Sequence, residues 1–171
     1  MRFSKYSFFQ IILKLFPLLL LFFIVFSETD TYFANFEYFS FSFVYILIFF
    51  WVLKNPEVLG YGFIFLAGLV NDVVVGLPIG SSSIAYLFLA GCAAYIRAMT
   101  VHISLLSDWI AFIPSIAFTN SVYFIVLSLL LEININYLSL LLETVITIIV
   151  YPFFAILFNI FRDTFVKSYV E

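Results

Sequence analysis

The sequence predicts an all-α integral membrane protein, and three observations carry that prediction. Hydrophobic residues make up 65% of the 171 residues and charged residues only 10%, whereas a soluble domain has roughly 45–50% and about 25%. Phenylalanine alone occurs 25 times, which suits a surface that faces lipid. The apolar residues form six stretches, each long enough or nearly so to cross roughly 30 Å of hydrocarbon. These stretches lack the alternation of a barrel strand, so they must pair their backbone groups as helices.

The six predicted helices lie, in chain order, at residues 8–27, 39–53, 58–76, 82–98, 107–131 and 138–161. The first is favoured as an uncleaved anchor over a signal peptide, because Lys14 interrupts its apolar run and five further spans follow. The second is short. The third ends at a turn with two glycines and a proline, Gly76-Leu77-Pro78-Ile79-Gly80, which is typical of a tight connection.

The last three helices each contain a feature that predicts how they pack. The fourth begins in a run of serines, as helices often do, and has small residues at intervals of four that allow close helix packing, within the bundle or against a partner: Ala90, Ala94 and Ala98. Asn120 in the fifth predicts an interhelical hydrogen bond. Pro152 in the sixth predicts a kink or a break that frees the backbone carbonyl near Ile148.

The positions of the basic residues predict the orientation. All seven fall on one side of a six-span count, namely Arg2, Lys5, Lys14, Lys54, Arg97, Arg162 and Lys167. The positive-inside rule makes that side the cytoplasm, so both termini are predicted to be cytoplasmic. The opposite loops contain acidic residues and no base. Trp51 and Trp109 are expected at the inner interface, as members of an aromatic belt.

Composition and loop length exclude several functions. A net charge of −3 argues against nucleic-acid binding, which needs a clustered basic surface. A single cysteine, Cys92, excludes an internal disulfide and a thiolate zinc site. The lone histidine, His102, lies in a predicted inner loop beyond Arg97, which argues against a serine–histidine pair within the membrane. No connection is long enough for a folded domain, and no phosphate-binding loop occurs, so we expect no catalytic residues, no cofactor and no metal.

Two carboxylates are predicted inside the membrane, where a charge is costly and is by default a candidate for function. Asp72 and Glu143 both fall in the outer layer, and no basic residue lies at that depth. Asp72 precedes the start of the fourth helix, so its carboxylate is predicted to accept hydrogen bonds from the amides and hydroxyls of Ser81–Ser83 and to staple two helices together. A contact with a ligand or partner, or a proton shared with Glu143, remains open for Asp72. Glu143 either extends to the outer surface or contributes to such a site.

The run from Gly68 to Leu87, GLVNDVVVGLPIGSSSIAYL, resembles the signature of the MreD family of rod-shape-determining membrane proteins. In that family a glycine-bearing helix reaches an aspartate, and a glycine, a proline and a second glycine precede a serine-rich or small-residue helix start. The matching positions here are Gly68, Asp72, Gly76, Pro78 and Gly80, followed by Ser81, Ser82 and Ser83. The resemblance covers about 20 of the 171 residues, and the rest of the chain is too generic to align.

The resemblance implies a non-enzymatic scaffold in the bacterial inner membrane that regulates cell shape and lateral peptidoglycan synthesis. It implies direct association with the bitopic protein MreC and, through it, with MreB filaments, a glycan polymerase and a class B transpeptidase. It also implies a fold similar to the substrate-binding S-components of vitamin transporters.

An S-component of a vitamin transporter is therefore the main alternative. Such proteins typically have a small-x-x-x-small pattern with alanines in the first span, and the first span here, IILKLFPLLLLFFIVF, contains neither alanine nor glycine. That absence favours the scaffold. An intramembrane hydrolase is a third possibility, and only Asp72 and Glu143 support it.

Overall fold

The computed structural model describes residues 8–27, 41–100, 104–130 and 137–170, and every regular element in these ranges is helical. The side chains of 8–14, 129–130 and 163–170 lie outside the described part, as do the predicted loops at 28–38 and 132–136. The elements are α1 (Phe8–Ser27), α2 (Phe43–Lys54), α3 (Tyr61–Val75), α4 (Ser81–Met99), α5 (Leu105–Ile125), a π-helical turn η1 (Val126–Leu130) and α6 (Tyr137–Val170).

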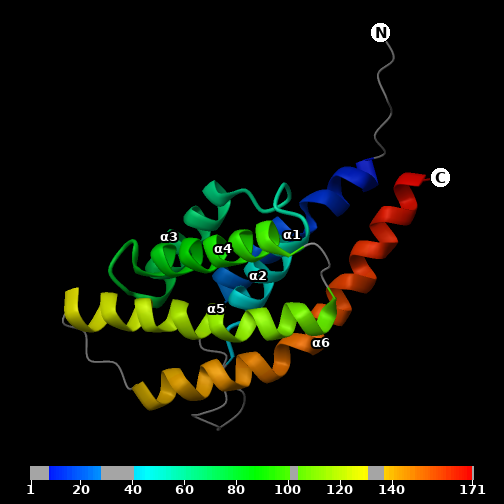
Figure 1. The fold of residues 1–171 in the computed structure, drawn as a ribbon. Helices are drawn as coiled ribbons and strands as arrows, with labels where there is room; N and C mark the ends of the chain where they lie inside the picture. Colours follow the sequence, from blue (N-terminus) through cyan, green and yellow to red (C-terminus); the bar gives the residue numbers. More distant parts are fainter. Residues whose placement is uncertain (1–7, 28–40, 101–103, 131–136, 171) are drawn as a thin grey trace, which may run out of the picture.

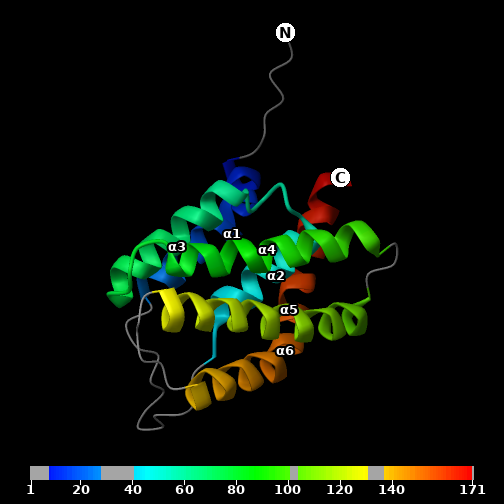
Figure 2. The same cartoon turned by 60° about the vertical axis from the view of Figure 1, so that its left-hand side comes forward.

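The helices surround α2. Figures 1 and 2 show α3, α4, α5 and α6 following one another side by side, with α2 behind α4 and α5. Helix α2 packs against α1, α4, α5 and α6, and every residue from Val44 to Leu53 is buried. A helix that is apolar on all sides belongs in an interior. The first residues of α1 and the last residues of α6 lie at the same end of the bundle (Figure 1).

Three of the helical segments are long and apolar enough to cross a membrane: Ser81–Met99, Leu105–Ser128 and Tyr137–Arg162. The apolar helical segments Leu15–Ser27, Phe43–Lys54 and Tyr61–Val75 are shorter. The outward faces are also apolar, since Phe23 is 71% exposed, Phe153 68% and Ile149 64%. A surface of this kind is costly in water and suits lipid, so the structure supports an all-α membrane protein.

Several helix ends differ from the predicted ones, each for a local reason. Helix α3 begins at Tyr61, because Asn55–Leu59 forms a turn ahead of Gly60. Helix α5 begins at Leu105, because the Ser104 hydroxyl accepts a hydrogen bond from the Ser107 amide at 3.2 Å and caps it. Helix α6 continues past residue 161 to Val170, because no glycine or proline interrupts the chain there.

Pro152 bends α6 without breaking it. The helix is continuous through the proline, and its orange-to-red half turns away from its first half in Figure 1. A proline removes the amide that would bond to the carbonyl four residues earlier, here Ile148. That carbonyl accepts a hydrogen bond from Trp109 Nε1 of α5 at 2.9 Å, so the kink and the freed carbonyl are confirmed.

The predicted aromatic belt is wrong for Trp51. Its side chain is 3% exposed and packs in the core beside Phe50 and Phe158. The reason is the central position of α2, which brings every side of this helix against a neighbouring helix. The interhelical bond predicted for Asn120 is confirmed, because its Nδ2 donates to the Thr144 hydroxyl of α6.

Candidate functional site

Asp72 connects the end of α3 to the start of α4. Its carboxylate is fully buried and accepts two backbone hydrogen bonds, from the Gly80 amide to Oδ2 at 2.7 Å and from the Ser82 amide to Oδ1 at 2.8 Å. The N-cap of α4 is Gly80, which has no side chain to satisfy the free amides of the first turn. Asp72 therefore caps a helix other than its own, at the end where a negative charge is favoured.

Three glycines make this hairpin geometry possible. At Gly68 the two helices touch, because an added Cβ would lie 2.4 Å from Ser83 Cα. Gly76 ends α3 in the left-handed conformation at φ 76°, and the Leu77 amide closes back onto the Asp72 carbonyl at 2.8 Å, as in a Schellman motif. Gly80 is also left-handed, at φ 105°, a region that side chains with a Cβ avoid.

The serine hydroxyls do not bind Asp72, which corrects part of the sequence prediction. Ser81 Oγ donates to the Pro78 carbonyl at 2.7 Å, and Ser83 Oγ donates to the Phe65 carbonyl of α3 at 3.0 Å. Ser82 Oγ accepts from Asn71 Nδ2 at 2.9 Å. The backbone amides bind the carboxylate because the free N–H groups of the first turn already point out of the start of α4. The serine hydroxyls instead form hydrogen bonds that connect α4 to the turn and to α3.

A small polar cavity of about 160 Å³ lies beside the hairpin, and we call it the outer polar pocket. Helices α2 to α6 all contribute to its wall, which consists of Ser42, Tyr45, Asn71, Val75, Leu77, Ser82, Tyr86, Asn120, Tyr123, Leu140 and Glu143. Glu143 therefore faces a cavity, whereas Asp72 does not line it. The two predicted carboxylates occupy the same end of the bundle but serve different structures.

Asn71, which the sequence analysis did not single out, also lines this pocket. Its side chain is 7% exposed, and its Oδ1 has no hydrogen-bond partner among the described residues. A signal was present in the sequence, since an asparagine inside an apolar helix needs a partner. Asn71 precedes Asp72 in the chain, and the functional prediction was assigned to Asp72.

A buried ion pair lies at the opposite end of the bundle. Lys54 Nζ at the end of α2 lies 2.7 Å from Asp108 Oδ2 in the first turn of α5, and the two side chains are 8% and 1% exposed. Asp108 Oδ1 has no hydrogen-bond partner in the described part of the chain. Lys54 was predicted on the cytoplasmic side, but nothing in the sequence indicated that Asp108 is its partner.

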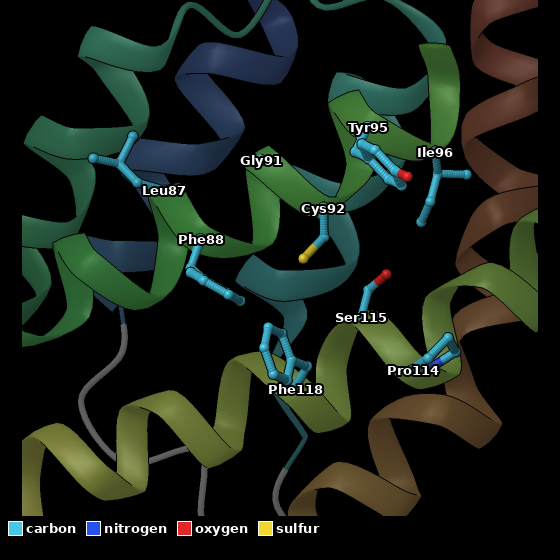
Figure 3. Close-up of a pocket in the computed structure, with 9 residues that line it drawn as sticks. All are labelled: Leu87, Phe88, Gly91, Cys92, Tyr95, Ile96, Pro114, Ser115 and Phe118. Carbon is cyan, nitrogen blue, oxygen red and sulfur yellow. The ribbon is translucent and has the colours of Figure 1, made fainter. Parts of the chain in front are cut away.

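An apolar groove of about 660 Å³ runs between α4 and α5 and contains Cys92. Figure 3 shows Phe88 and Phe118 at one part of the groove, and Cys92 and Ser115 directed into it. The predicted alanine stripe is only partly internal, because Ala90 is buried, Ala94 is partly buried and Ala98 is exposed. No charged residue is among the residues that line the groove, so it provides mainly apolar contact area, with the Cys92 thiol as its one potentially reactive group among the described residues.

Within the described ranges no three His, Cys, Asp or Glu side chains come close enough to hold a metal ion. The fold defines a helical membrane protein in which Asp72 caps a helix, Lys54 pairs with Asp108, and Glu143 lines one small pocket. Comparison of the chain with protein-family models, with curated proteins and with solved structures finds no match.

Proposed function

We propose that this protein is a non-enzymatic membrane scaffold of the bacterial machinery that elongates the cell wall, and that it maintains rod shape through association with MreC. The proposal rests on the resemblance of residues 68–87 to the MreD signature. In this proposal the inner-membrane location, the partner MreC and the links to MreB, a glycan polymerase and a class B transpeptidase all follow from that resemblance.

The observation that carries the proposal is the hairpin between α3 and α4. Each motif position has a distinct geometric task there. Gly68 permits the helices to touch, Asp72 caps α4, Gly76 and Gly80 adopt left-handed conformations, and the Pro78 carbonyl accepts from Ser81. A spacing in which every position is needed by the backbone is a specific pattern, so the match supports shared architecture more strongly than its length suggests.

We infer six membrane spans with both termini in the cytoplasm. The shared end of α1 and α6 (Figure 1) supports an even number of crossings. The Lys54–Asp108 pair marks that end as the one that holds the basic residues. A reporter fused after Glu171 and one inserted at 30–35 should report opposite compartments. The same compartment for both would contradict six spans.

The two cavities formed by the described residues suit the scaffold better than a vitamin-binding S-component. Sites for drug-sized ligands measure roughly 300–1,000 Å³, and the outer polar pocket measures about 160 Å³. The apolar groove is larger, but its wall offers almost no hydrogen-bonding groups with which to recognise a vitamin.

Depletion of the protein in a rod-shaped bacterium that encodes it tests the proposal. We expect the cells to become round, vitamin uptake to remain intact, and MreC to co-purify with a tagged copy in mild detergent. A matched copy that carries Asp72→Ala should lose shape complementation in proportion to its loss of folded protein. Normal rods after depletion, or co-purification with a transporter ATPase in place of MreC, would overturn the proposal.

A further inference from the structure

The outer polar pocket contains the Glu143 carboxylate, and no described residue of its wall is a cation. The loops that flank this end of the bundle, at 28–40 and 131–136, contain no Lys, Arg or His in their sequence. The Lys54 ammonium is committed to Asp108 at the other end. A positive partner favours the charged form of a carboxylate among apolar helices, and a cationic ligand in the pocket would supply one to the half-buried Glu143.

The same pocket contains a hydrogen-bond acceptor that lacks a donor. Asn71 is more than nine-tenths buried, its Nδ2 is used by Ser82 at 2.9 Å, and its Oδ1 has no partner in the described ranges. Buried polar atoms are nearly always paired. A group that binds here must therefore donate hydrogen bonds as well as bring a positive charge.

Size and wall chemistry narrow that group further. A volume of about 160 Å³ corresponds to roughly five water molecules at about 30 Å³ each, which is enough for a short aminoalkyl group. Tyr45 and Tyr86 form an edge-to-face pair in the wall, with ring centroids 5.8 Å apart, and aromatic rings attract organic cations. A divalent metal ion would want several carboxylates, and among the described residues of the wall Glu143 alone is acidic.

We propose that the outer polar pocket binds a primary ammonium group, with Glu143 as its counter-charge and Asn71 Oδ1 as a hydrogen-bond acceptor. The ammonium belongs either to the headgroup of an aminophospholipid or to a small soluble amine. This site goes beyond the scaffold role and does not depend on it.

Binding of ethanolammonium to the full-length protein in nanodiscs tests the site. The measurement is thermal stability as a function of ethanolammonium chloride, with sodium chloride at equal ionic strength as the reference. We expect a saturable stabilisation of the wild type and an apparent affinity about tenfold or more lower in Glu143→Gln, because the charge-assisted bond is lost. Glu57→Gln removes an equal charge from an exposed residue of the α2–α3 connection and should behave like the wild type.

Two lipid compositions distinguish the sources of the amine. If the ligand is a lipid headgroup, phosphatidylethanolamine discs should mask the ethanolammonium response that phosphatidylglycerol discs allow. Native mass spectrometry should then find phosphatidylethanolamine retained by the wild type and lost from Glu143→Gln. If the ligand is a soluble amine, both discs should give the same response.

A second variant allows the test even if Glu143→Gln does not fold. Glu143→Gln replaces a charge by a neutral side chain of the same size and should fold; if it does not, Glu143→Asp keeps the charge and should bind more weakly than the wild type. A wild type that responds to ethanolammonium no more than to sodium, and retains no aminophospholipid, overturns the proposal. So does an equal response in Glu143→Gln.

Discussion

Replacement of Asp72 should destabilise the protein in a graded way. The carboxylate is fully buried and satisfies the amides of Gly80 and Ser82. Leaving a buried donor unpaired costs about 1–3 kcal/mol, so Asp72→Ala, which strands both amides, should cost about 2–6 kcal/mol. Asp72→Asn keeps one acceptor oxygen and turns its amide toward the second donor, so it should cost about half as much.

The assay is the yield and melting temperature of detergent-solubilised protein, measured by fluorescence-detected size exclusion and by thermal unfolding. Val73→Ala is the matched control, because this neighbouring side chain is 68% exposed on the lipid-facing side of α3. The expected order is wild type and Val73→Ala, then Asp72→Asn, then Asp72→Ala. Equal and normal stability of both Asp72 variants, with shape complementation lost in both, would refute the capping role and make Asp72 a contact residue.

Three further sets of substitutions test the packing. Gly68→Ala should lower the stability by about 1–3 kcal/mol, since its Cβ would meet the backbone of α4, whereas Gly62→Ala has open space and should be neutral or stabilising in a thermal melt. Lys54→Met or Asp108→Leu alone should cost about 3–5 kcal/mol, because each leaves a buried charge unpaired, and the double variant should recover most of the yield; a double variant as poor as either single one would argue against the pair. Trp109→Phe should cost about 1–3 kcal/mol by removing the donor to the α6 carbonyl, and an unchanged melting temperature would show that this bond contributes little.

Hydrophobicity and local turn chemistry were enough to predict the helices and the hairpin. The apolar runs locate α1, α3 and α4 within a few residues, and the glycine–proline turn marks the α3–α4 connection. Asp72 could be assigned to the start of α4 because both are adjacent in the chain. The specific donors could not be assigned, since the choice between amides and hydroxyls depends on the left-handed backbone at Gly80.

Contacts between distant segments could not be predicted from the sequence. The Lys54–Asp108 pair joins α2 to α5, and the outer polar pocket needs five helices to assemble it. Composition also could not show that α2 is central, because a helix that is apolar on all sides has the same sequence pattern whether lipid or protein surrounds it. The misplaced aromatic belt at Trp51 has this origin.

Because α2 is buried among other helices, its length does not have to match the thickness of the bilayer. The twelve residues of α2 extend about 18 Å, well short of roughly 30 Å of hydrocarbon. Hydrophobic mismatch has a free-energy cost only where a helix contacts lipid. The helices around α2, namely α1 and α3 to α6, expose apolar side chains, and they can tilt about a short core whose length need not match. Lipids with longer or shorter chains should therefore change the inclination of the outer helices and leave the contacts of α2 as they are.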